Sequence, residues 1–185
     1  MAEPSSLHPN VLTLRARFFF QAFFFFRLHS RRMPAITALL HTHNDGLRLG
    51  RCLETLYPCD DIVIVDHGSD DWTLRVAREY GACILNAAES IPASARGRWI
   101  LCLDPRESLT EALAASLFEW KSETLAGQSA FSMFLREETA EGWVQNPEAQ
   151  TRLVPANWSL WEGHFPAPEK AAVALEGELL RFVLP

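Results

Sequence analysis

Beyond Met33, the apolar residues form short runs that predict buried strands. These runs, rich in Ile, Val, Leu and Cys, lie at 35–41, 62–66, 82–85 and 99–104. Short, mainly apolar runs are typical of parallel strands that are covered on both faces. Between and after them, apolar residues recur at helical spacing: Leu49, Cys52, Leu53 and Leu56, then Trp72, Val76 and Tyr80, then Leu109, Leu113, Leu117 and Trp120. The pattern therefore predicts strands that alternate with helices whose apolar residues face the core.

Polar residues and a glycine mark the expected ends of these helices. Asn44 or Asp45 is expected to cap the first helix and Ser69 the second, because their side-chain oxygens can accept the free N–H groups of a first turn. Gly81 suits the position that follows the second helix. Residues 108–111 read Ser-Leu-Thr-Glu, which has the spacing of a capping box and predicts the start of a third helix.

The second half of the chain has a different pattern. Residues 129–135 alternate as a strand does, and the chain beyond Gly142 consists of short apolar segments and turns. Strand–helix alternation followed by such a tail predicts an α/β sandwich around a mostly parallel central sheet. A length of 185 residues suits one domain, which we assign to residues 33–185.

Residues 1–32 do not share this pattern. Basic residues flank a phenylalanine-rich centre at 18–26. Nine helical residues span about 14 Å, which is too short to cross a bilayer. Two interpretations stay open: a disordered or mis-assigned extension, or an anchor that lies on a membrane surface.

Charge and cysteine usage narrow the class of protein. A formal net charge of −6 argues against a nucleic-acid-binding protein, which usually carries a basic face. The four cysteines form no C-x-x-C pair, which indicates reduced thiols rather than a disulfide framework. We therefore expect a cytoplasmic protein, with peripheral contact at the inner face of the membrane as the alternative.

Polar residues gather where three of the predicted strands end. These clusters read H-T-H-N-D at 41–45, D-H-G-S-D-D at 66–71 and D-P-R-E at 104–107. Ligands of open α/β sheets bind beyond the carboxyl ends of the strands. The sequence therefore predicts that the three clusters converge on a binding site.

The segment that follows the second predicted strand carries a specific motif. Residues 65–73 read V-D-H-G-S-D-D-W-T and match the pattern V-D-x-G-S-x-D-x-T. The chain resembles the family 2 glycosyltransferases from residue 34 to 185, strongly to residue 86 and weakly beyond it. It is most similar to the small branch associated with lipopolysaccharide core sugars. The resemblance implies a GT-A fold that binds a nucleotide-diphosphate sugar.

The resemblance also implies which residues hold the nucleotide. They lie in the three strand-end clusters: Thr42, Asn44, Asp66, Gly68, Ser69, Asp71 and Asp104. Asp66 would accept hydrogen bonds from the base or the ribose, and Gly68 would let the backbone approach the ligand. The alternative interpretation is that Asp66, Ser69 and Asp71 only form a turn and a helix cap.

The metal-binding motif of the family is incomplete in this chain. Family members carry Asp-x-Asp in an L-D-A-D-E run, whose carboxylates hold Mg²⁺ or Mn²⁺ at the diphosphate. Here Asp104 is present but Arg106 stands in the second position, so we expect at most a weak metal site. Arg106 could instead bind the diphosphate through two parallel N–H groups, without a metal. It could equally be an ordinary arginine that pairs with Asp104 or Glu107.

The acceptor side departs from the family as well. Family members show a Val-His-Glu-like segment after W-x-G, whereas this chain reads G-H-F-P-A from Gly163. An inverting transferase needs a base for the acceptor hydroxyl. Glu162 and His164 are weak candidates, and both also suit a surface position. Arg152, Trp158 and Trp161 are the residues expected at the acceptor, while Trp72, Trp99 and Trp120 fall on core-facing positions.

Two hypotheses of function follow. In the first, the chain transfers a sugar from a nucleotide-diphosphate donor to a cell-envelope glycan or a lipid-linked acceptor, with inversion and in an impaired or metal-independent form. In the second, it is a catalytically inactive relative that acts as a binding or partner protein.

Overall fold

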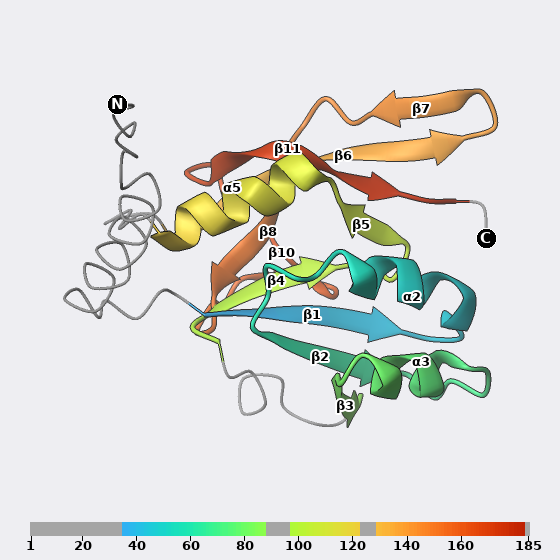
Figure 1. The fold of residues 1–185 in the computed structure, drawn as a ribbon. Helices are drawn as coiled ribbons and strands as arrows, with labels where there is room; N and C mark the ends of the chain where they lie inside the picture. Colours follow the sequence, from blue (N-terminus) through green and yellow to red (C-terminus); the bar gives the residue numbers. More distant parts are fainter. Residues whose placement is uncertain (1–34, 88–96, 123–128, 184–185) are drawn as a thin grey trace, which may run out of the picture. The chain divides into compact units, whose positions relative to one another are not determined.

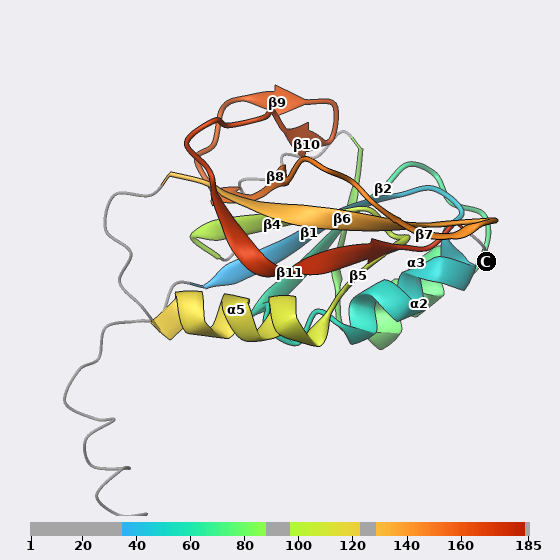
Figure 2. The ribbon, with the colours of Figure 1, turned by 90° about the horizontal axis from the view of Figure 1, so that it is seen from above.

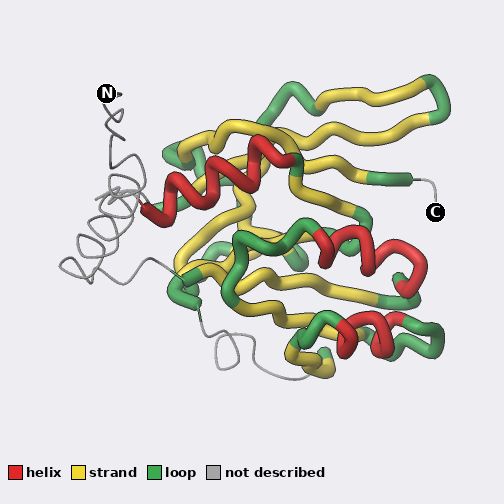
Figure 3. Tube along the Cα trace, viewed as in Figure 1, coloured by secondary structure: helices red, strands yellow, loops and turns green. Residues whose placement is uncertain are grey.

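The computed structural model describes residues 35–87, 97–122 and 129–183. They belong to one compact unit, Pro34–Pro185, and form a large mixed sheet with helices packed against it (Figures 1 and 3). The predictions for residues 1–32 fall outside this described part. Within it, no helix combines the length and the apolar character that crossing a membrane requires.

One half of the sheet is parallel. Its strands lie in the order β3-β2-β1-β4, and each neighbouring pair runs parallel. The register places Thr42 level with Asp66, and Leu40 level with Leu103. The carboxyl ends of β1, β2 and β4 therefore lie at the same edge of the sheet. The bounds are β1 Ile36–Thr42, β2 Asp61–Asp66, β3 Cys83–Asn86 and β4 Trp99–Leu103.

The other half of the sheet is mixed. It continues in the order β8-β6-β11-β5, and β7 pairs with β6 as a hairpin. β6 and β11 are parallel, while β8 is antiparallel to both β4 and β6, and β5 is antiparallel to β11. The bounds are β5 Glu107–Leu109, β6 Phe131–Thr139, β7 Gly142–Gln145, β8 Gln150–Pro155 and β11 Val173–Arg181. The α/β prediction is confirmed, with parallel pairing concentrated in the first half of the sheet.

The three described helices lie on one face of the sheet and the β9–β10 hairpin on the other (Figure 2). Side chains of β1 alternate between the faces: Leu40 joins the core beneath the helices, and Leu39 joins the core that Trp158 and Phe165 cover. The four cysteines are free thiols. The bounds are α2 Gly46–Glu54, α3 Thr73–Glu79, α5 Glu111–Ser122, β9 Trp161–Glu162 and β10 Phe165–Pro166.

The caps predicted for the first two helices are wrong. α2 has no side-chain cap from Asp45, whose Oδ2 instead accepts the N–H of His43 at 2.9 Å. The Gly46 N–H, in the first turn, donates to Oδ2 of Asp71 at 2.9 Å. The same carboxylate accepts the Thr73 N–H at 2.8 Å. A single aspartate between β2 and α3 thus serves the first turns of both helices.

The remaining helix-start predictions also need correction. α3 begins at Thr73 rather than after Ser69, so Trp72 precedes the helix and is 70% exposed instead of facing the core. The expected capping box is absent because Ser108 belongs to β5. The Leu113 N–H donates to Oγ1 of Thr110 instead, at 3.3 Å.

Candidate functional site

The structure brings the first two polar strand-end clusters together through direct hydrogen bonds. The Thr42 hydroxyl donates to Oδ1 of Asp66 at 3.3 Å. The backbone N–H of Asp70 donates to Oδ1 of Asn44 at 2.9 Å, and the Asn44 N–H donates to the Ser69 hydroxyl at 3.0 Å. Each loop therefore holds the other in place at the carboxyl edge of the sheet.

Asp66 organises the turn that follows β2. Its Oδ2 accepts the N–H groups of Gly68 and Ser69, both at 3.0 Å, and its Oδ1 accepts the Ser69 hydroxyl at 2.5 Å. Burial opposes ionisation of Asp66, but the hydrogen bonds from Ser69, Gly68 and Thr42 outweigh it and hold its pKa below the usual value. Gly68 has a φ of +85°, a conformation that favours glycine.

The third cluster meets the first in an open cleft of about 440 Å³, here called the rim cleft. Thr42 from β1 and Asp104, directly after β4, both line it, whereas Asp66 is not among its lining residues. The volume lies within the range of small-molecule sites. Its lining residues are His41, Thr42, His43, Asp45, Arg48, His67, Asp104, Pro105, Arg106 and His164.

Arg106 and Asp104, which both line the rim cleft, form a two-pronged ion pair. The Nε of Arg106 donates to Oδ1 of Asp104 at 2.9 Å and its Nη2 donates to Oδ2 at 2.8 Å. Burial opposes ionisation of Asp104, but the bonds and charge of Arg106 keep its pKa below the usual value. Both carboxylate oxygens face a cation and the second acid of Asp-x-Asp is missing. The residues present therefore do not fit a Mg²⁺ or Mn²⁺ site at Asp104.

Arg152 lies in a buried ion-pair network and not on an open surface. It is 2% exposed, and its two terminal nitrogens donate to both oxygens of Glu107, at 3.1 and 2.9 Å. One of them also donates to Gln150 at 2.7 Å. Arg181 adds a further bond to Glu107 at 2.8 Å. These bonds give Arg152 a structural role, and its place at the acceptor stays a prediction.

A second cleft, here called the tryptophan cleft, lies beside the rim cleft on the face of the sheet that carries the hairpin. It has a volume of about 340 Å³, and Trp158 and Trp161 line it together with Ile100 and Val65. The Trp158 N–H donates to the Leu160 carbonyl at 2.7 Å, and the Trp161 N–H to the Trp158 carbonyl at 2.9 Å. Because both N–H groups are bonded to nearby backbone carbonyls, the indoles can offer a ligand their rings but no free donor.

The two candidate bases lie in different places. His164, in the turn of the β9–β10 hairpin, lines both the rim cleft and the tryptophan cleft. Glu162 lines a third hollow of about 390 Å³, shared with Arg152 and Arg181. Of the two candidates, therefore, only His164 lines the cleft that contains Asp104 and the cleft that contains Trp158.

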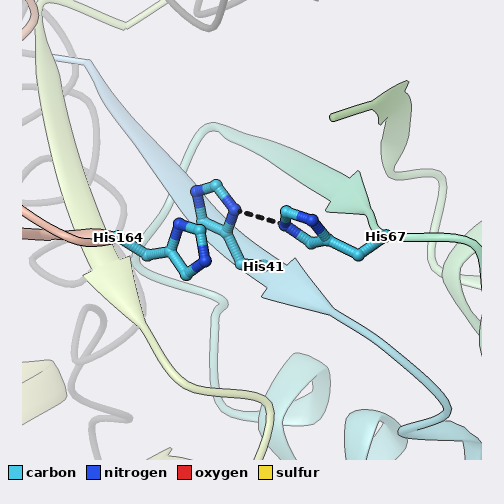
Figure 4. A group of neighbouring side chains, drawn as sticks. All are labelled: His41, His67 and His164. Atoms are coloured by element: carbon cyan, nitrogen blue, oxygen red, sulfur yellow. Dashed lines mark hydrogen bonds between the residues drawn. The ribbon is translucent and has the colours of Figure 1, made fainter. Parts of the chain in front are cut away.

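Sequence reasoning missed a cluster of histidines at this junction. His41, His67 and His164 come from β1, the loop after β2 and the hairpin (Figure 4). Nδ1 of His41 lies 2.9 Å from Nε2 of His67, and the ring of His164 stacks on His41 with centroids 3.9 Å apart. Burial, aided by the charges of the other two histidines, lowers the pKa of His41 to about 4. The only sequence signal was that His41 and His67 stand at the ends of predicted strands.

Comparisons with known proteins identify the fold but not a family. No protein-family profile matches the chain. A TPR repeat-containing protein of Synechococcus elongatus is 30% identical over an alignment of 122 residues, which covers 60% of this chain and 30% of that protein. The solved structure of S. aureus TarS overlaps 80% of this chain and 37% of its own, at 13% identity and a TM-score of 0.52.

Two further solved structures are similar. The S. aureus TarS 1-349 structure covers 80% of this chain and 60% of its own, at 13% identity and a TM-score of 0.53. Glucosyl-3-phosphoglycerate synthase from Mycobacterium tuberculosis, solved with Mn²⁺, UDP-glucose and phosphoglyceric acid, covers 56% of this chain at 18% identity and a TM-score of 0.44. The chain spans less than two thirds of the length of each protein compared. The overlap with TarS confirms the predicted fold, a mixed α/β GT-A fold.

Proposed function

We propose that this chain is a nucleotide-sugar transferase of family 2 type whose donor binds in the rim cleft. The observation that carries the proposal is that Thr42 and Asp104, from two neighbouring parallel strands, face one open cleft together with Arg48 and Arg106. This cleft lies beyond the carboxyl ends of the strands, where open α/β sheets bind their ligands.

The nucleoside would lie against the loops that Asp66 and Asp71 hold in shape. Asn44, Gly68 and Ser69 supply backbone and short polar groups there. Because four hydrogen bonds already engage Asp66, its contribution is to fix the turn that receives the nucleoside. Asp71 contributes in the same way, through its bonds to both helices.

The diphosphate would be held by guanidinium groups instead of a metal. The ion pair with Asp104 uses two of the five N–H donors of Arg106, and its side chain is 40% exposed. Among the described residues, the buried Nε of Arg48 has no hydrogen-bond partner. Guanidinium forks match phosphate oxygens well. Arg106 and Arg48 are therefore the proposed diphosphate ligands.

The acceptor would enter through the tryptophan cleft. Indole faces suit the apolar face of a sugar ring, and the proposed acceptor is a cell-envelope glycan or a lipid-linked sugar presented on the cytoplasmic side of the membrane. Direct displacement with inversion requires a base near the acceptor hydroxyl. His164, which lines both clefts, is the residue best placed for that role.

Calorimetric titration of the full chain with UDP and with GDP, in chelator and then in Mn²⁺, tests donor binding. We expect one diphosphate to bind with no requirement for Mn²⁺. Arg106→Gln should weaken binding by about tenfold or more, because a charge-assisted bond contributes roughly 1.5–3 kcal/mol. Arg75→Gln, which removes an exposed arginine of α3, is the matched control. Binding of neither nucleotide, or binding only in Mn²⁺, would contradict the proposal.

One observation favours the second hypothesis, a binding domain without catalysis. Arg48 and Arg106 are balanced by Asp45 and Asp104, so the acidic and basic side chains that line the rim cleft cancel in charge. A transferase must stabilise the charge that grows on the leaving nucleotide. Incubation with several nucleotide sugars separates the two hypotheses: donor hydrolysis or transfer supports the enzyme, and tight binding without turnover supports the binding domain.

A further inference from the structure

Three histidines meet where the rim cleft and the tryptophan cleft join. His41, His67 and His164 line both clefts and come from three segments that are far apart in the sequence. Figure 4 shows their rings facing one another, with the dashed contact between His41 and His67. Among the described residues, one nitrogen from each ring can be chosen so that all three lie within 4.8 Å of one another.

These separations are close to those of a metal site. Zn²⁺ binds imidazole nitrogens at about 2.0–2.1 Å in tetrahedral geometry, which places neighbouring ligand atoms about 3.4 Å apart. The Nδ1 of His41 and the Nε2 of His67 are already 2.9 Å apart. That pair would open by about 0.5 Å. The third nitrogen, which lies within 4.8 Å of the others, would approach by up to roughly 1.4 Å, a shift within reach of side-chain rotation.

His164 is the ligand that must turn. Its ring is inclined by only 16° to that of His41, and the lone pairs of imidazole lie in the ring plane, so two stacked rings do not aim at a common point. His164 is exposed and follows Gly163, whose φ is +60°, in the hairpin turn.

We propose that His41, His67 and His164 bind one divalent transition-metal ion, with Zn²⁺ as the best-suited species. Three imidazoles from the protein and an open fourth position make up a ligand set that zinc uses in catalytic sites. Imidazole suits Zn²⁺, Cu²⁺ and Ni²⁺, whereas Mg²⁺ and Mn²⁺ favour oxygen ligands. This site therefore differs in position and in chemistry from an Asp-x-Asp site at Asp104.

The ion would cross-link three segments that are far apart in the sequence. It would join the β9–β10 hairpin to the ends of β1 and β2 and leave its open position towards the two clefts. A further consequence rests on the proposed function: the ion would add positive charge to a rim cleft whose two arginines and two aspartates cancel. With the ion bound, His164 would serve as its ligand and not as the base for the acceptor hydroxyl. Metal binding itself does not depend on whether a nucleotide binds.

Zinc titration of the metal-free full chain, freed of any histidine tag, tests the proposal. A chromophoric chelator that competes for Zn²⁺ gives the affinity and the stoichiometry, and visible absorption of added Co²⁺ reports tetrahedral nitrogen ligation. We expect one Zn²⁺ site per chain. Mg²⁺ at the same concentration should not compete with Zn²⁺ for it. His67→Ala and His164→Ala each remove an exposed ring. Each should weaken Zn²⁺ binding by about 10- to 100-fold or more, since loss of a residue that only hydrogen-bonds to a metal ligand already has that effect.

His43→Ala is the matched control, because His43 is exposed on the same rim, does not belong to the cluster and contacts it through the backbone carbonyl of His67, at 3.0 Å, and not through a ligand ring. It should retain the affinity of the natural chain. Circular dichroism establishes that each variant is folded. A stoichiometry well below one, equal weakening by His43→Ala, or full binding by the double variant His67→Ala/His164→Ala would overturn the proposal. None of these readouts requires a nucleotide, so a failed nucleotide titration leaves the result unaffected.

Discussion

Two acid–arginine pairs lie almost side by side in this molecule and differ mainly in burial. At the rim, Asp104 and Arg106 are 19% and 40% exposed. Beneath them, Glu107 and Arg152 are 0% and 2% exposed. The two pairs touch, because the Asp104 N–H donates to Oε2 of Glu107 at 2.9 Å. The same kind of ion pair thus occurs once at the partly exposed rim and once in the protein interior.

The buried pair has a structural role that its strands explain. Glu107 begins β5, Arg152 lies on β8, and Arg181, which also bonds to Glu107, lies at the end of β11. The network therefore joins three strands of the mixed half directly below the site. The outer pair holds no strands together and keeps donors of Arg106 within reach of the cleft. Burial, and not residue type, separates the arginine that supports the site from the arginine proposed to bind the ligand.

Removal of the buried charge should give the largest change in stability. Glu107→Gln leaves the guanidinium of Arg152 buried without its counter-ion, and breaking a buried pair in this way costs about 3–5 kcal/mol of unfolding free energy. Urea denaturation followed by circular dichroism measures the change. The variant should also bind nucleotide weakly, because glutamine has one acceptor oxygen instead of two for the Asp104 N–H and the two arginines.

Glu137, an exposed acid that pairs with Arg181 as Glu107 does, provides the control. Glu137 lies 3.6 Å from the other terminal nitrogen of Arg181 and is 45% exposed. Glu137→Gln should change the unfolding free energy by no more than about 1 kcal/mol, as exposed pairs do. Equal losses in the two variants would contradict the view that burial distinguishes the pairs.

The parallel half of the sheet was predictable because its signal is local. Each buried strand is a mainly apolar run, so β1 at 36–42 and β2 at 61–66 differ from the predicted 35–41 and 62–66 by no more than one residue at either end. β5 was not predicted, because its first residue is the charged Glu107. The partners of Glu107 stand 45 and 74 residues away, and no local pattern reports such distances.

The site was predictable in its location and less so in its chemistry. Parallel strand order alone places the clusters at 41–45, 66–71 and 104–107 on one edge, and the structure brings them there. The sequence does not show which carboxylates are free to bind a ligand. Asp66 and Asp71 accept hydrogen bonds from backbone N–H groups that only the fold brings near. The histidine cluster also escaped notice, since its third member arrives from a hairpin about 100 residues later in the chain.

An intermediate loss of stability is expected for Asp71→Ala. Its carboxylate accepts N–H groups in the first turns of α2 and α3, so its removal deprives two helices of a partner. Loss of a cap typically costs about 0.5–2 kcal/mol, and the upper part of that range is expected here. Asp70→Ala is the control, because Asp70 joins Asn44 through its backbone N–H. A fall of similar size in both variants would show that the carboxylate of Asp71 is not the cause.

The smallest change in stability is expected for the rim pair, and it should depend on pH. Arg106→Gln should lower the unfolding free energy by at most about 1 kcal/mol at pH 7. The pKa of Asp104 is lowered in the folded state, because the bonds and charge of Arg106 outweigh the effect of burial. Its contribution is therefore present above the unfolded pKa of about 3.9 and is lost as the pH falls through the folded value.

Urea denaturation of the natural chain and of Arg106→Gln, from neutral pH down to below the folded pKa of Asp104, measures this dependence. The two curves of unfolding free energy should converge on the acid side, because protonated Asp104 has no charge for Arg106 to stabilise. Arg75→Gln, which breaks an exposed pair with Glu79, should show no comparable convergence. A loss of several kcal/mol for Arg106→Gln would place Arg106 with Arg152 among the residues that support the fold, and the proposal that it serves a ligand would then lose its physical basis.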